Sequence, residues 1–160
     1  MKRKVLLIVL PLIVLLSGVA SGSYYVYNNT VNVDVIYEGI KIDELDVGGM
    51  TKEDAYDFLV AEKKAQDLGK AMDLKYEDAK YTITLDDIGY GYNFEEAIEE
   101  AFSMGRKGGP IKRYNEIKNI KKHGIYIPLE SHYDMAKINK IATNISEELY
   151  KESKDAIFNF

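Results

Sequence analysis

The chain has 160 residues, of which 46 % are apolar, and it carries 21 Lys and Arg against 26 Asp and Glu. This length holds one domain and an appendage but not two full domains. The net charge of −5 argues against nucleic acid as a partner, and the lack of cysteine excludes disulfides, a cysteine nucleophile and a lipoprotein anchor.

The N-terminus predicts a membrane segment. Three basic residues, Lys2 to Lys4, precede an uncharged run from Val5 to Val33. A bilayer core needs about 20 mostly apolar residues in helical form, and residues 5–27 are long enough to supply them. We therefore expect residues 1–4 to be a cytoplasmic tail and residues 5–27 to be a single-pass transmembrane anchor.

A cleaved signal peptide is the alternative for the same segment, because Gly18 and Ala20 suit a cleavage site. Three tyrosines favour the anchor, since they lie where an interfacial aromatic belt is expected. They are Tyr24, Tyr25 and Tyr27. Both interpretations keep the basic residues inside and export the remainder, with the N-terminus in and the C-terminus out.

The exported part should begin with a spacer, residues 28–32, followed by a domain over residues 33–160. Residues 33–42 alternate loosely between apolar and polar side chains around the turn pair Glu38-Gly39. They predict one or two short strands.

A helix and a hairpin should follow. Thr51 can act as an N-cap with Asp54 at the acidic position of a capping box, and the helix should end near Gly69. Residues 72–85 read as two strands joined at Glu77-Asp78, because the second strand alternates between apolar side chains and threonines.

The second helix has the clearest pattern in the chain. After a loop over residues 86–92, Asn93 can cap a helix with Glu96 three residues later, and Gly105 should end it. Its apolar side chains share one face. They are Phe94, Ala97, Ile98, Ala101 and Phe102.

The last third predicts a helix over residues 111–120, a strand over 125–129, a helix over 133–150 and the start of a strand after residue 154. Two sets of apolar residues should be buried by these helices. They are Ile111, Tyr114, Ile117 and Ile120 in the first, and Met135, Ile138, Ile141, Ala142, Ile145 and Leu149 in the second. We expect the domain to be truncated at its C-terminus, since the final strand has only begun.

These elements predict an α+β fold, a small mixed domain of short strands and three to four helices preceded by one transmembrane helix. Catalytic groups are scarce in it. A serine triad needs a histidine base, and His123 and His132 lie at expected helix ends, where structural or solvated roles suit them. Asp86 and Asp87 suit loop capping better than a paired-carboxylate or cation site. We therefore expect no enzyme activity, no cofactor and no metal.

Tyrosine is abundant, with 13 residues, and it marks the candidate ligand site. Tyr90 and Tyr92 lie in a glycine-flanked loop, where flat rings could stack on sugar or peptide, although packing is the alternative role. Asn93 follows this loop, and Arg106 and Tyr114 border the glycine-rich loop after the second helix. These five residues are the candidate ligand-binding set.

Three segments resemble a known family. They are DVGGMTKEDA (46–55), YTITLDDIGYGYNFEEAIEEAFSMGR (81–106) and the final DAIFNF (155–160). They are similar to the peptidoglycan-binding domain in the N-terminal halves of VanW-like proteins and of some L,D-transpeptidases, and the resemblance spans roughly residues 33–160. It implies a noncatalytic α and β module that faces the cell wall and positions a following domain at peptidoglycan. One departure is that these 160 residues include no catalytic domain, and the L,D-transpeptidase reaction requires a cysteine nucleophile, which they lack.

Three hypotheses follow. The first is a membrane-anchored, extracytoplasmic module that binds the glycan or stem peptide of peptidoglycan. The second is a structural spacer or protein-interaction domain, with a catalytic domain or another envelope protein as partner. The third is a hydrolase that uses Asp86 or the glutamate-rich helix face.

Overall fold

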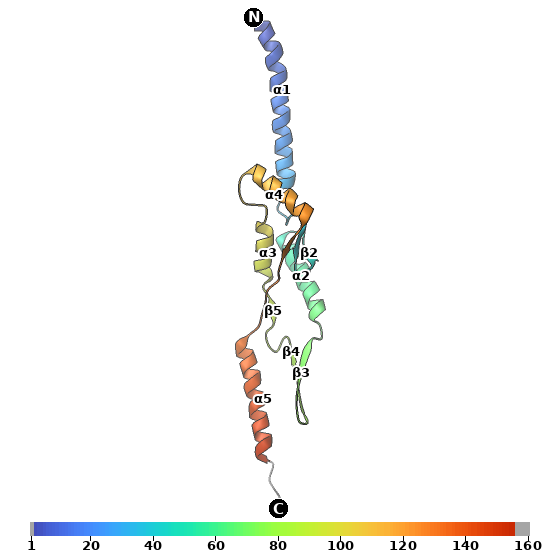
Figure 1. The fold of residues 1–160 in the computed structure, drawn as a ribbon, viewed down its shortest axis with the longest axis vertical. Coiled ribbons are helices and arrows are strands. Elements are labelled where there is room, and N and C mark those ends of the chain that lie inside the picture. The colour runs from blue at the N-terminus through green and yellow to red at the C-terminus, as the bar shows by residue number, and fades with distance from the viewer. Residues whose placement is uncertain (1, 156–160) are drawn as a thin grey trace, which may run out of the picture. The chain divides into compact units, whose positions relative to one another are not determined.

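The computed structural model describes the backbone of residues 2–155 and the side chains of residue 11 and residues 13–150. The described chain divides into two compact units (Figure 1). The first unit comprises residues up to Tyr56 together with Glu96–Pro128, and the second comprises Asp57–Glu95 together with the residues from Leu129 onward. The expected final strand over 155–160 lies almost wholly outside the described residues.

The first unit begins with helix α1 (Lys2–Val26), which continues as a short π-helical turn, η1 (Tyr27–Val31). A helix was expected here, and the expected spacer is largely helical, with Val31 buried. A search of the described residues finds no helix that combines the length and the hydropathy of a membrane span. The structure therefore does not support the transmembrane part of the prediction.

A three-stranded sheet lies at the centre of the first unit. Its order is β2 (Leu45–Asp46), β1 (Ile40–Ile42) and β6 (Ile125–Ile127). β1 pairs antiparallel with β2 and parallel with β6. Gly39 precedes β1 with a φ of +91°, and an added Cβ would lie 2.6 Å from the carbonyl oxygen of Ile120. Only glycine fits this approach of strand to helix.

The core of the first unit comes from the sheet and two helices. The helices are α3 (Phe94–Ser103), which begins in the second unit, and α4 (Pro110–His123). Their buried apolar residues and those of the sheet region are Ile36, Ile40, Ile42, Val47, Ala97, Ile98, Ala101, Ile117, Ile120 and Ile127. The predicted apolar face of α3 is therefore confirmed at its three central positions.

The predicted apolar stripe of α4 is wrong at its N-terminal end. Ile117 and Ile120 are buried, but Ile111 is 80 % exposed and Tyr114 is 40 % exposed. The reason is geometric, because residues spaced by three drift around a helix with 3.6 residues per turn. Nine residues, from Ile111 to Ile120, bring the side chain to about the opposite face.

The second unit contains the C-terminal part of α2 (Lys52–Asp67) and a hairpin of β3 (Ala71–Tyr76) and β4 (Ala79–Thr84). The hairpin register pairs Met72 with Ile83, so the predicted hairpin is confirmed. No residue of β3 is buried, and β4 alternates between half-buried and exposed side chains.

Two further elements complete the second unit. β5 (Gly91–Tyr92) pairs antiparallel with β7 (Ser131–His132), where sequence reasoning expected a loop before Asn93. Helix α5 (Met135–Asp155) forms as predicted, capped by Asp134, whose carboxylate accepts from the backbone N–H of Ala136. The prediction that its apolar side chains are buried is wrong for the described residues, since Ile138, Ile141, Ile145 and Leu149 are half-buried and Met135 and Ala142 are exposed.

Candidate functional site

The second unit contains a cleft of about 450 Å³. One wall is the C-terminal part of α2 with the turn that follows it, and the other is formed by the end of β4 and the strand β5. Its charged and aromatic lining includes Lys63, Lys64, Asp67, Lys70, Tyr90 and Tyr92. Two of the predicted site residues therefore line it.

Three aromatic rings form one row beside the cleft. Tyr90 and Tyr92 meet edge to face with ring centroids 5.3 Å apart, and Phe94 lies 5.5 Å from Tyr92. Alternate residues of an extended segment point to the same side, which explains the spacing of two. Gly91 between the tyrosines faces His132, and a Cβ there would lie 2.9 Å from Nε2 of that ring. A side chain at position 91 would therefore displace the His132 ring from its place beside β5.

Asp67 fixes the polar side of the cleft. Its carboxylate accepts a hydrogen bond of 2.8 Å from the hydroxyl of Tyr92 and one of 2.7 Å from Nζ of Lys70. The Asp67 side chain is 16 % exposed. Burial works to raise the pKa of Asp67, but the bonds from Lys70 and Tyr92, with the charges of Lys70 and Lys63, hold that pKa below its ordinary value. Asp67 is therefore an ionised bridge between α2 and β5.

Tyr92 is held in the same network. Burial, followed by the neighbouring hydroxyl of Tyr90 and the carboxylate of Asp67, raises the pKa of Tyr92. Nζ of Lys63 lies 5.4 Å from the centroid of its ring. Tyr92 therefore stays neutral and positioned, and Tyr90 presents its ring at the edge of this arrangement.

Asn93 connects the loop to the neighbouring strand. Its Oδ1 lies 2.9 Å from Nδ1 of His132, with the ring nitrogen as donor, and its backbone N–H donates to the carbonyl oxygen of Glu130. These two contacts link β5 to β7, and Asn93 does not line the cleft.

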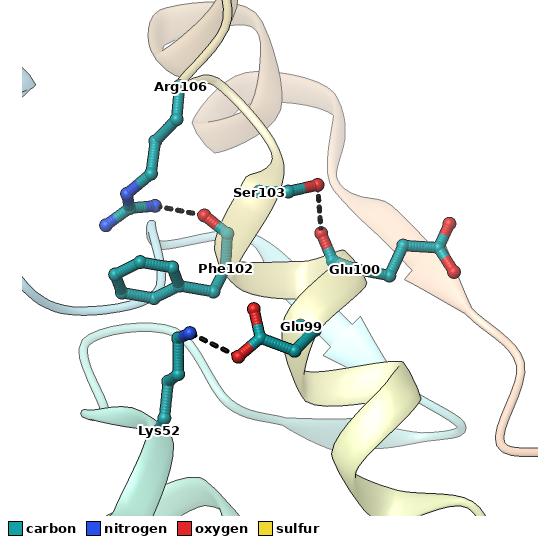
Figure 2. A network of polar contacts seen from close by, with 6 residues as sticks. All are labelled: Lys52, Glu99, Glu100, Phe102, Ser103 and Arg106. Carbon is teal, nitrogen blue, oxygen red and sulfur yellow. Dashed lines mark hydrogen bonds and ion pairs between the residues drawn. The ribbon is translucent and has the colours of Figure 1, made fainter.

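Arg106 belongs to the first unit, where its guanidinium is engaged by the protein itself. It donates to the carbonyl oxygens of Phe102, Val33 and Val35 at 2.6, 2.9 and 2.7 Å. Its Cζ lies 3.7 Å from the ring centroid of Phe102, whose other neighbour is the ammonium of Lys52, paired with Glu99 (Figure 2). Burial lowers the pKa of Arg106. These contacts give Arg106 a structural role in the first unit.

Tyr114 also belongs to the first unit. It lines an apolar groove of about 450 Å³ together with Tyr27, Pro110 and Ile111. The predicted set therefore comprises Tyr90, Tyr92 and Asn93 in one unit and Arg106 and Tyr114 in the other, and its convergence on one ligand stays a prediction.

Sequence reasoning missed the contribution of α2. Asp67 and Lys70 flank the turn that ends the helix, and a C-terminal helix turn usually signals only a cap. Their link to Tyr92, 25 residues further on, depends on tertiary structure.

Asp86 and Asp87 lie near the cleft, and they differ in their surroundings. The carboxylate of Asp87 accepts from the backbone N–H and the hydroxyl of Thr84, at 2.8 and 2.6 Å, and these bonds lower its pKa. The predicted capping role of Asp87 is thereby confirmed. Asp86 lines the cleft. Among the described residues, no group of His, Asp and Glu is arranged to hold a metal ion.

The cleft is half open, with aromatic rings on one side and lysines on the other, and this arrangement suits ligand binding. Residues 81–160 match the family described as "Putative peptidoglycan binding domain", which confirms the resemblance, and the chain belongs to this family. The segment 46–55 lies outside the match, and the VanW-like and L,D-transpeptidase context stays a prediction. The comparisons with curated proteins and with solved structures found no match.

Proposed function

We propose that this chain binds peptidoglycan without chemical conversion, through the cleft of the second unit. The observation that carries the proposal is that the match to the peptidoglycan-binding family includes the β4–β5 wall of the cleft, with Tyr90 and Tyr92. The family is one of binding modules, which agrees with the expectation of a noncatalytic role.

The chemistry of the cleft suits such a ligand. Peptidoglycan combines sugar rings, which stack on flat aromatic side chains, with peptide carboxylates, which pair with ammonium groups. The cleft contains three lysines and two acids, Asp67 and Asp86. Its exposed ammonium group is that of Lys64, next to the Tyr90 ring of the lining, because Lys63 is buried and Lys70 pairs with Asp67. It is thus locally basic in a chain of net charge −5.

We also propose that the domain is held on the outer side of the cell membrane by its N-terminal helix. The support is in the sequence, where the basic Lys2 to Lys4 precede an uncharged run up to Val33. Protease added to whole protoplasts should digest the domain. Protection of the domain, with the protein in the cytosolic fraction, would contradict export.

The binding experiment is cosedimentation of the full chain in mild detergent with purified insoluble peptidoglycan. We expect retention of the wild type and about tenfold weaker retention of Tyr90→Ala, a loss of about 1.4 kcal/mol. Lys64→Gln should weaken it about threefold, because it removes one exposed charge.

Tyr76→Ala is the matched control, because Tyr76 is 57 % exposed in the same unit but does not line the cleft. It should bind like the wild type. Retention no greater than that of an unrelated acidic protein would contradict the proposal and favour the alternative of a spacer or protein-interaction domain.

A further inference from the structure

The first unit contains a strongly basic segment around helix α4. The segment from residue 106 to residue 123 contains seven basic residues and a single acid, although the whole chain is acidic. The basic residues are Arg106, Lys107, Lys112, Arg113, Lys118, Lys121 and Lys122. The acid, Glu116, is half-buried and accepts from the backbone N–H of Gly105. Helix α4 is therefore a basic element in an acidic protein.

The two long sides of α4 have different roles. One side enters the core through Ile117 and Ile120, and Arg113 beside them donates to the carbonyl oxygen of Val31 at 2.6 Å. The opposite side points outward. It consists of Ile111, Asn115, Lys118 and Lys122, all exposed and spaced at helical periodicity. We call these four residues the outer stripe of α4.

The outer stripe begins beside an exposed apolar surface. Ile111, 80 % exposed, lines the groove that α4 forms with Val19, Val26 and Tyr27 of the N-terminal helical segment. Figure 1 shows α4 next to the C-terminal end of α1. The described side chains of α1 continue this surface, since Leu15, Val19 and Tyr24 are 64, 61 and 71 % exposed. A contiguous exposed apolar surface of this kind marks a site of contact with a membrane or another protein.

We propose that α4 docks on the membrane surface, with the lysines of its outer stripe against anionic lipid headgroups and Ile111 in the acyl boundary. Three observations favour a lipid surface over another partner: the charge complementarity, the exposed isoleucine among lysines, and the continuity with the apolar α1. The docking rests on the proposed attachment of α1 to the membrane. It would fix the orientation of the first unit at the bilayer.

The experiment uses the absence of cysteine from the chain. Asn115→Cys, in the outer stripe, carries an environment-sensitive fluorophore, and the full chain is reconstituted into vesicles with nitroxide-labelled lipid as quencher. One vesicle preparation contains phosphatidylcholine alone, and the other includes phosphatidylglycerol. Label positions at Leu15→Cys in α1 and at the exposed Ala65→Cys in α2 serve as controls.

The expected result is strong quenching at position 115 in anionic vesicles and weak quenching in zwitterionic vesicles or at high salt. Each lysine near an anionic surface favours the docked state about fivefold. The double change Lys118→Gln and Lys122→Gln should therefore lower the ratio of docked to undocked protein by about 25-fold. A matched double change at the exposed Lys75 and Lys140 should leave it unchanged.

Quenching at position 15 without quenching at position 115 would overturn the docking of α4 and leave the membrane attachment standing. Absence of quenching at both positions would overturn both. Quenching at position 115 that does not change with lipid charge or with the loss of Lys118 and Lys122 would also contradict the proposal. A response of the label to added polyphosphate, in place of anionic lipid, would assign the stripe to a wall polymer and overturn membrane docking.

Discussion

The two units of this protein use their apolar side chains differently. In the first unit, Ile36, Ile40, Ile42 and Val47 are fully buried, and the sheet and helices close around them. Among the described residues of the second unit, only Leu59 and Lys63 are buried. Tyr90 and Tyr92 are half-buried beside the cleft, and no residue of the hairpin is buried. The difference separates a region with a closed apolar core from a region with little buried apolar surface, and the second kind of region has the lower local stability.

The largest expected effect tests this difference in packing. Ile42→Ala removes a fully buried side chain and should lower the free energy of unfolding by about 3 kcal/mol. Ile83→Ala, the same change at a half-buried position of β4, should cost less than about 1 kcal/mol. Urea unfolding followed by circular dichroism gives both values, and equal losses would contradict the contrast between the units.

Arg106 provides the next test. Arg106→Met removes the donor of three backbone carbonyl oxygens and should cost about 2 kcal/mol, without weakening peptidoglycan binding. Arg106→Lys should recover little, because an ammonium cannot reproduce the planar guanidinium. Lys107→Met, at the exposed neighbour, is the control. Lost binding with unchanged stability would instead make Arg106 a ligand residue.

A smaller effect is expected in the cleft. Tyr92→Phe keeps the ring but removes the hydroxyl that donates to Asp67, and it should cost about 1 kcal/mol of stability. Tyr76→Phe, which changes an exposed hydroxyl in the same unit, should cost nothing measurable. Hydrogen exchange of α2 and β5 amides should report the loss locally. Unchanged exchange in Tyr92→Phe would show that the bond to Asp67 is not stabilising.

The smallest effect concerns pH. The pKa of Asp67 is lowered from 3.8, so the folded state favours its carboxylate. Its contribution to stability is present above the unfolded pKa and is lost as the pH falls through the lowered folded value. Between pH 5 and 2, the wild type should lose more stability than Asp67→Asn, as measured by paired urea titrations. Parallel pH profiles would contradict the bridging role of Asp67.

Local pattern was sufficient for several elements and insufficient for others. The capping box at Thr51 and the alternation of β4 predicted α2 and the hairpin, because both signals are local. The buried face of α4 was misjudged, since a spacing of three residues drifts around the helix. Tyr90 and Tyr92 were found from their glycine-flanked loop. Asp67 was not predicted, because its hydrogen bond with Tyr92 joins residues that are 25 positions apart in the sequence.

The central claim is that peptidoglycan binds in the cleft of the second unit. The most direct test is to titrate the isotope-labelled full chain with a soluble disaccharide-peptide fragment of peptidoglycan and to follow backbone amide NMR shifts. We predict saturable shifts confined to residues 60–71 and 84–94, and their loss in Tyr90→Ala. Saturable shifts in the first unit alone, or none at all, would contradict the account.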